Sequence, residues 1–321
     1  MKKISVLLMI LVMLFVVGCG GKEPIKQGVS PFIGGKMGLT GEFIEGAPPK
    51  QVYDQGSSSF AIGLKFENKG EHFVEAGNGY VEILGINSKD FGLSSQAGLK
   101  KDIPGIRGSK KNTDGTNLPG DTSFVEFAGL KYMPDLKGNT DFKFRANLCY
   151  DYKTQVSSKI CVNKNPLGNV GEAICKVTGE KDVENSGGPV HITMLKESPL
   201  GENKVQILFE IEHVGDKDDM FYRVGTDCND AIINPDKYKV FLKVTSDVNG
   251  ALPRCSGLEQ GNSVESEGFV TLFNGQKRAV ICTLDLSAVD SVFEELFTVD
   301  LSYRYHQFFE KSIEIQDVSA S

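Results

Sequence analysis

Residues 144–152 read FRANLCYDY, and residues 297–305 read FTVDLSYRY. Phe, Leu and a Tyr-x-Tyr pair occupy the same steps in both segments. Apolar residues at every second position are typical of a strand with one buried face. A Tyr late on such a strand can bury its ring and hydrogen-bond the backbone at a corner of a β-sandwich. The segments therefore predict two β-units of one design with structural tyrosines; an aromatic binding platform is the alternative role.

A second match, in the same order along the chain, supports an internal duplication. FAIGLKFENKG (60–70) aligns with VQILFEIEHVG (205–215), and both have alternating apolar residues and a closing Gly. The two matches have offsets of 145 and 153 residues, as expected of a tandem repeat. Strand patterning common to any two β-sandwiches is the alternative explanation. Similar alternating runs occupy residues 80–86, 124–127, 160–162, 191–195, 238–244, 269–273, 279–286 and 313–315.

Turn signals separate these runs. Asn274-Gly275 lies between two apolar runs and predicts a hairpin, because a tight two-residue turn needs positive φ. Residues 287–296 carry apolar side chains at helical spacing and predict one short helix. The rest of the pattern predicts an all-β, antiparallel chain.

The N-terminus, MKKISVLLMILVMLFVVGC (1–19), has the layout of a secretory signal. Lys2 and Lys3 precede an apolar run over residues 4–17, which is shorter than the roughly 20 residues that a membrane span needs. Val16-Val17-Gly18-Cys19 resembles the lipobox of prokaryotic lipoproteins. That resemblance implies cleavage before Cys19 and a lipid thioether on its sulfur. An ordinary secretory signal, in which Cys19 is incidental, is the alternative.

Cleavage would leave 303 of the 321 residues, enough for about two domains. Each domain is expected to fold as its own sandwich, with a modest polar interface between the two and functional surfaces on exposed loops. The predicted organisation is a signal peptide (1–18), a lipidated tether (19–36), a first domain (37–165), a linker (166–186) and a second domain (187–321).

Charge agrees with export. Loss of Lys2 and Lys3 moves the net charge from −7 to −9, so the chain has no electrostatic reason to bind nucleic acid or an anionic membrane. We expect it at the extracytoplasmic face of the cell membrane, held by its lipid, with a protein or glycan partner at the cell surface.

Six cysteines remain besides Cys19, and an even number in an exported protein indicates disulfides. A zinc site is the alternative, but the sequence has no Cys-x-x-Cys pair. Opposed residues on the two strands of a hairpin lie within disulfide range. On these grounds the predicted bonds are Cys149–Cys161 across a hairpin, Cys255–Cys282 within the second domain, and Cys175–Cys228 between the linker and a loop.

The strand pattern resembles Ig-like modules of the CARDB type, which occur in tandem on prokaryotic surface proteins. Apolar alternation ending in an Asn-x-Gly turn (60–70), followed by a late Tyr-bearing strand, carries that resemblance. The layout of lipobox and two cysteine-bearing β domains looks like that of archaeal surface lipoproteins. The resemblance implies two tandem Ig-like antiparallel β-sandwiches after a lipoprotein signal peptide. It carries no catalytic residues, and the chain departs from true immunoglobulin domains in having no Trp.

Sequence motifs of catalysis are missing, including Gly-x-Ser-x-Gly, His-Glu-x-x-His and the Walker loop. We therefore expect no enzyme and no cofactor. Residues 99–122 are basic, whereas residues 212–236 are acidic. Asp216, Asp218 and Asp219 are possible calcium ligands, although their spacing is not that of an EF-hand and Lys217 would oppose a cation. A solvated loop is the preferred interpretation, and docking of the basic loop of one molecule on the acidic loop of another is a third.

The sequence favours a lipid-anchored, non-catalytic structural or interaction module at the cell surface. A solute- or glycan-binding surface lipoprotein is the alternative function.

Overall fold

The computed structural model describes residues 30–168, 174–229, 233–248, 251–259 and 266–320. Residues 31–321 form one compact unit. The predicted signal peptide (1–18), Cys19 and the tether up to residue 29 lie outside the described residues. Across the described part of the chain, no helix has both the length and the apolar character to cross a membrane.

The fold is all-β, as the alternating pattern predicts, and its sheets are antiparallel except where β2 joins β19. Within the described ranges, the largest sheet has nine strands and follows the order β17-β15-β19-β9-β4-β5, with β11 on β9 and both β14 and β2 on β19. Its strands are β2 (Gln51–Tyr53), β4 (Gly79–Leu84), β5 (Lys100–Asp102), β9 (Thr140–Val162), β11 (Val183–Asn185), β14 (Met220–Tyr222), β15 (Lys239–Ser246), β17 (Glu267–Thr271) and β19 (Phe293–Gln316).

Two smaller sheets supply the opposite layers. The first is β1-β3-β8, and the second is β10-β12-β13-β18-β16. β1 packs beside β19 and β12 beside β9. The strands are β1 (Leu39–Phe43), β3 (Phe60–Asn68), β8 (Thr122–Leu130), β10 (Gly179–Glu180), β12 (Val190–Gly201), β13 (Lys204–His213), β16 (Arg254–Ser256) and β18 (Arg278–Asp285). A small hairpin, β6 (Lys110–Lys111) with β7 (Asn117–Leu118), and the short 3₁₀ turns η1 (Gln96–Leu99), η2 (Phe273–Gly275) and η3 (Val318–Ala320) complete the elements.

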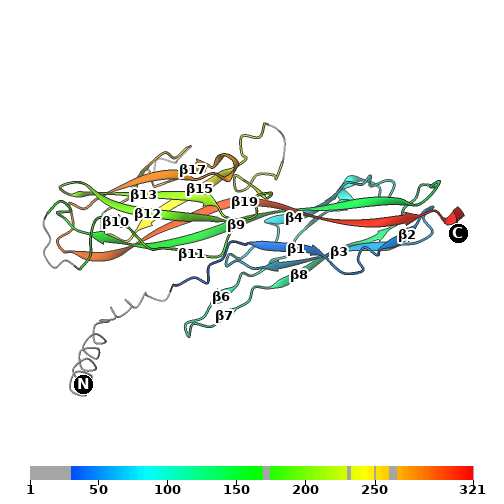
Figure 1. Cartoon of the computed structure of the whole chain (residues 1–321), viewed down its shortest axis with the longest axis horizontal. Helices are drawn as coiled ribbons and strands as arrows, with labels where there is room; N and C mark the ends of the chain where they lie inside the picture. Colours follow the sequence, from blue (N-terminus) through cyan, green and yellow to red (C-terminus); the bar gives the residue numbers. More distant parts are fainter. Residues whose placement is uncertain (1–29, 169–173, 230–232, 249–250, 260–265, 321) are drawn as a thin grey trace, which may run out of the picture. The chain divides into compact units, whose positions relative to one another are not determined.

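β9 and β19 run through both halves of the chain. All 23 residues of β9 pair with β19, from Val162 opposite Phe293 to Thr140 opposite Ile315, and Figure 1 shows the two strands side by side. The first part of β9 pairs on its other edge with β4, and the later part with β11. The expectation that residues 37–165 and 187–321 form separate sandwiches with a modest interface is therefore wrong. One hydrophobic core cluster includes residues of both halves.

The duplication inferred from sequence is visible in the strand order. In the first half, β4 lies between β5 and β9; in the second, β15 lies between β17 and β19. The sheets β1-β3-β8 and β12-β13-β18 likewise correspond strand for strand. Asp151 and Arg304 occupy equivalent positions in the two repeats, because they are 153 residues apart. They also lie opposite each other in the β9–β19 ladder. A pseudo-two-fold axis therefore passes between these two residues.

The four repeated tyrosines surround this axis and are buried. Tyr150 lies opposite Tyr305, and Tyr152 lies opposite Tyr303. The Tyr150 hydroxyl accepts from the Leu39 N–H at 3.1 Å, which is the predicted link from a late tyrosine to the sandwich backbone. The hydroxyls of Tyr152, Tyr303 and Tyr305 bind Asn68, Thr154 and His213 respectively. The predicted structural role of these tyrosines is therefore confirmed.

Glycines at matching positions make room for two of these hydroxyls. A Cβ on Gly70 would collide with the Tyr152 hydroxyl, and a Cβ on Gly215 would collide with the Tyr305 hydroxyl. These are the closing glycines of the two aligned segments, 60–70 and 205–215. The shared Gly thus permits a close approach of backbone to tyrosine, in addition to ending a strand.

All six cysteines form disulfides, but two of the three predicted bonds are wrong. Cys255 bonds Cys282, its register partner between β16 and β18, as predicted. The other bonds are Cys149–Cys228 and Cys161–Cys175. The predicted hairpin between Cys149 and Cys161 does not exist, because both lie on the continuous strand β9. Twelve residues of extended strand separate them by about 40 Å, far beyond disulfide range.

Two further local predictions need correction. Asn274 and Gly275 have the positive φ values expected of a tight turn, but they connect β17 and β18, which belong to different sheets. The turn is thus a crossover between layers. Residues 287–296 form no helix: Val289 closes a turn on Leu286, and β19 begins at Phe293. Pairing with β9 overrides the weak helical spacing there.

Candidate functional site

Two carboxylates of the acidic loop, those of Asp219 and Asp236, bind side chains of their own protein. Asp219 is partly buried and accepts from the Tyr305 hydroxyl at 2.9 Å. Asp216 accepts the N–H of Asp218 within the same turn, and Asp236 lies 4.0 Å from the Arg223 guanidinium. Among the described residues, Asp216, Asp218 and Asp219 do not bring their oxygens within 4.8 Å of one another. The calcium-ligand hypothesis for these three residues gains no geometric support.

A different acidic cluster does have converging oxygens. Side-chain oxygens of Asp54, Asp135 and Asp317 all lie within 4.8 Å of one another. Asp54 is buried, and its two oxygens accept the N–H groups of Leu136 and Val318 at 2.8 and 3.0 Å. Asp135 binds the Lys137 ammonium at 2.8 Å. This cluster therefore already has a structural role in tying the C-terminal turn to two loops.

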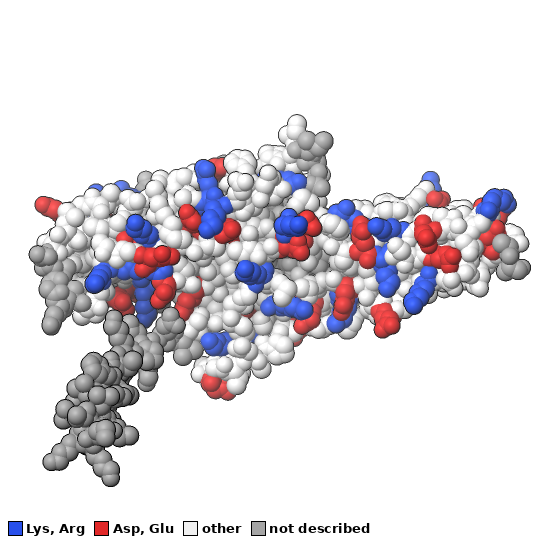
Figure 2. All heavy atoms as spheres, viewed as in Figure 1, with Lys and Arg blue, Asp and Glu red and all other residues white. Residues whose placement is uncertain are grey.

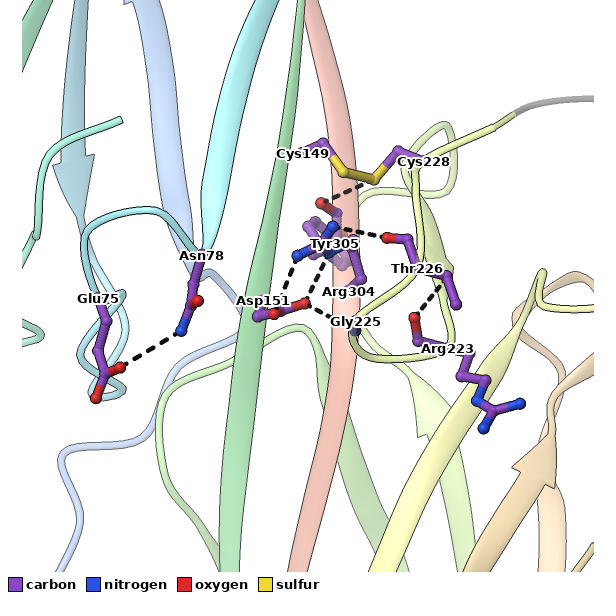
Figure 3. A network of polar contacts seen from close by, with 10 residues as sticks. All are labelled: Glu75, Asn78, Cys149, Asp151, Arg223, Gly225, Thr226, Cys228, Arg304 and Tyr305. Atoms are coloured by element: carbon purple, nitrogen blue, oxygen red, sulfur yellow. Dashed lines mark hydrogen bonds and ion pairs between the residues drawn. A yellow bond between two sulfur atoms is a disulfide. The ribbon is translucent and has the colours of Figure 1, made fainter. Parts of the chain in front are cut away.

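The loop that carries Cys228 covers the pseudo-two-fold axis (Figure 3). Arg304 binds both carboxylate oxygens of Asp151, at 2.7 and 3.1 Å, and donates to the Thr226 carbonyl. Figure 3 shows the Cys149–Cys228 disulfide beside this contact. The hydrogen bond from Arg304 to Thr226 and the disulfide thus hold this loop on the outer face of the large sheet.

On the inner side of the axis, His213, Tyr305 and Asp219 form a polar chain. The Tyr305 hydroxyl lies 2.9 Å from His213 Nε2 and 2.9 Å from Asp219 Oδ2. Burial lowers the pKa of His213 to about 4 and raises the pKa of Asp219 to about 6. The corresponding residue to His213 in the first half is Asn68, which binds Tyr152. The contact of His213 with Tyr305 thus corresponds to the structural contact that the side-chain amide of Asn68 makes with Tyr152 in the first half.

Replacing His213 by Asn should change how stability depends on pH. The pKa of His213 is lower in the folded protein than its ordinary value of 6.5, so folding excludes a proton there. The contribution of His213 to the free energy of unfolding therefore rises as pH increases from about 4 to 6.5. The stability difference between wild type and His213→Asn should grow with pH across that window, measured as urea unfolding at several pH values. A difference independent of pH would contradict the buried, neutral imidazole.

Asp219→Asn provides the opposite control. The pKa of Asp219 is higher in the folded protein than its ordinary value of 3.8. The contribution of Asp219 to the free energy of unfolding should therefore fall as pH rises from 3.8 to about 6. The two single variants should therefore deviate from wild type in opposite directions as pH changes.

Four cationic side chains line a hollow of about 440 Å³, which we call the cationic hollow. It is formed by the start of the described chain, the turn after β3, the basic loop, and the middle of β9. Its lining consists of Pro31, Phe32, Glu71, His72, Phe73, Arg107, Gly108, Ser109, Lys110, Lys111, Lys153, Gln155 and Ser186. Figure 2, in contrast, shows a face on which positive and negative side chains are interspersed.

Hydrogen bonds fix the backbone that carries the cations. Ser109 donates both its N–H and its hydroxyl to the Gly70 carbonyl, each at 2.7 Å. Ile106 exchanges two backbone hydrogen bonds with Val74, and the Arg107 carbonyl accepts from Asp121. The basic loop is therefore held in one conformation against the turn after β3.

The one carboxylate in the lining is occupied by backbone donors. Glu71 accepts the N–H groups of Ile33, Gly34 and Gly187 at 3.0, 2.9 and 2.6 Å. Lys153 binds Asp300 at 2.6 Å. Within the described part of the chain, Arg107 and Lys110 form no ion pair, and both are exposed. The hollow therefore keeps an excess of positive charge.

A second hollow, of about 560 Å³, includes His191. It lies over β10 to β13 and carries both signs of charge, including Lys36, Glu180, Lys181 and Glu212. Lys181 reaches out of this lining to the buried Glu197 at 2.8 Å. This hollow lacks the one-sided charge of the cationic hollow.

Sequence reasoning identified only part of the cationic hollow. The basic loop, with Arg107, Lys110 and Lys111, stands out as a charge cluster. His72, Phe73 and Lys153 come from other segments and carry no motif. Their convergence depends on the fold of β3 against β9, which the sequence pattern does not specify.

Comparisons with known proteins give no family. No family model matches the chain, and no curated protein matches it. Among solved structures, the serine-rich repeat adhesion glycoprotein of Streptococcus agalactiae aligns with 91% of this chain and 96% of its own, at 8% identity and a TM-score of 0.15. A likeness at that level carries no argument about fold or function.

Proposed function

We propose that the protein is an exported, lipid-anchored module of the cell surface that acts by interaction and without catalysis. The observation that carries this proposal is that every cysteine other than Cys19 is paired in a disulfide. Such bonds persist in oxidising compartments outside the cytosol. The secretory layout of residues 1–19 gives an independent reason for the same location.

The architecture suits a rigid display module. The ladder between β9 and β19 joins the two halves over the whole length of β9, and the Cys149–Cys228 bond ties the halves together again. Because relative motion of the halves would break this ladder, the protein would present its loops in a fixed arrangement to a surface partner.

Cys19→Ser tests the proposed location. The variant should lose its lipid and move from the membrane fraction to the soluble exported fraction, as measured by fractionation and mass spectrometry. Ser30→Ala, which leaves the thiol in place, should stay with the membrane. If the Cys19→Ser protein keeps residues 1–18 and still partitions with membranes, the lipoprotein proposal is wrong.

A second candidate is a solute- or glycan-binding surface lipoprotein. The cationic hollow favours it, because the fixed basic loop and the occupied Glu71 leave positive charge facing a concave surface. The nature of that ligand is considered next.

A further inference from the structure

We propose that the cationic hollow binds acidic sugars of a surface glycan, with Arg107 and Lys110 contacting the acidic groups and Phe73 contacting a sugar ring. This inference rests on the second proposed function and gives it a ligand class. Its starting point is the convergence of three segments, the turn after β3, the basic loop and β9, on one hollow.

Charge selects an anionic ligand. Arg107, Lys110, Lys111 and Lys153 line the hollow, whereas Glu71 is the only acidic residue among the described lining residues. Its carboxylate already accepts three backbone N–H groups. Arg and Lys side chains form charge-assisted hydrogen bonds with carboxylate and sulfate oxygens, and such bonds are stronger than neutral ones.

Preorganisation favours binding at this place. The Gly70 carbonyl holds Ser109 by two hydrogen bonds, and Asn68 donates to the Ile106 carbonyl at 3.1 Å. A Cβ on Gly108 would collide with the Glu71 backbone, so the loop lies directly against the turn after β3. Since the cations sit on a fixed backbone, less conformational entropy is lost when a ligand binds.

Size and lining favour a sugar over a small inorganic anion. The hollow has a volume of about 440 Å³, within the range of about 300–1,000 Å³ typical of sites for small organic ligands. Phe73 lines the hollow and is 45% exposed, so its ring can pack on the C–H face of a pyranose. Gln155 adds a side-chain amide suited to hydroxyls.

Two carboxylates of the acidic loop are unsuited to bind the hollow of a second copy. Asp219 binds Tyr305, and Asp236 faces Arg223. Those carboxylates would have to leave their own partners before they could bind the hollow of another molecule.

The test is calorimetric titration of the full-length protein in detergent with four probes: trigalacturonic acid, a heparin-derived tetrasaccharide, maltotriose and inorganic phosphate. Binding of either acidic oligosaccharide, with weaker binding of maltotriose and phosphate, is the expected result. Trigalacturonic acid carries carboxylates alone, whereas the heparin tetrasaccharide also carries sulfates, so tighter binding of the second would show that sulfate groups contribute. Failure of both acidic probes to bind, equal binding of maltotriose, or equal binding of phosphate would each overturn the proposal.

Variants locate the site. Arg107→Gln with Lys110→Gln should weaken binding of the acidic oligosaccharide about tenfold, as expected for the loss of two exposed charge contacts. Lys50→Gln with Lys196→Gln removes the same charge from exposed positions outside both hollows and should leave affinity unchanged. Equal weakening by the two double variants would show a bulk charge effect and overturn the proposed site.

Phe73→Ala separates the sugar contact from the charge contact. It should weaken oligosaccharide binding while leaving the weak phosphate response unchanged, because phosphate has no ring to pack on Phe73. Unchanged oligosaccharide affinity would remove the proposed role of Phe73. If neither acidic oligosaccharide bound while Cys19→Ser still released the protein from the membrane, this inference would be rejected. The proposed location would then stand.

Discussion

Residues 31–165, produced without the second half, should fail to show the cooperative unfolding transition of the intact chain. In the intact protein, residues 305–315 of β19 pair with residues 140–150 of β9, inside the first half. Without them, β9 would lose the partner on one whole edge and the side chains of Phe309 and Ile313 would be missing from the core region. A chain that loses both a central strand and its hydrophobic contacts lies below the usual margin of stability. Circular dichroism and urea unfolding measure the effect.

Complementation is the matched control. Residues 31–165 and 174–320, produced together, contain both long strands and should form a one-to-one complex with a single unfolding transition. A fragment 31–165 that is monomeric and unfolds cooperatively at the midpoint of the intact chain would contradict the continuous ladder and restore the two-domain interpretation.

Removing the Cys149–Cys228 bond should have the second largest effect. The bond joins residues 79 positions apart, so it strongly restricts the unfolded chain. The double variant Cys149→Ala with Cys228→Ala should lose about 4.5 kcal/mol in the chain-entropy model. The measurement is the free energy of unfolding from urea titration under oxidising conditions.

Cys161→Ala with Cys175→Ala is the comparison variant. This bond spans 14 positions, and the same model gives a loss of about 3 kcal/mol. Both variants remove one disulfide and its two sulfur atoms, so the difference between them reports the length of the closed segment. A smaller loss for the longer bond would contradict the assignment of its effect to the length of the closed segment in the unfolded chain.

The alternating pattern was sufficient to predict strands, layers and the internal repeat. Phe144 to Tyr152 and Phe297 to Tyr305 are strands as predicted, and their tyrosines are buried. The pattern was not sufficient to show where a strand ends. Lys153 to Lys159 is polar at several steps, which looks like a loop, but it continues β9 because β19 and β11 cover its edges. That one misplaced turn led to the wrong Cys149–Cys161 bond and to the wrong division into domains.

The candidate site was only partly predictable for a related reason. A run of lysines is visible in any sequence, so the basic loop could be noted. The hydrogen bonding of the Glu71 carboxylate by the N–H groups of Ile33, Gly34 and Gly187 could not, since it depends on segments that only the tertiary fold brings together. The acidic loop shows the reverse case. Its high charge density favoured a solvated loop, with calcium ligands as the alternative, yet Asp219 and Asp236 bind side chains of their own chain.

The pair at the pseudo-two-fold axis has a consequence for the origin of the chain. If two identical polypeptides exchanged these long strands as a homodimer, the residue on the symmetry axis would face its own copy. An acid would then oppose an acid, or a base would oppose a base, at the centre of the assembly. Fusion of two copies into one gene removes that identity constraint. Asp151 opposite Arg304 is an unlike pair of this kind, which a symmetric homodimer of identical chains could not have.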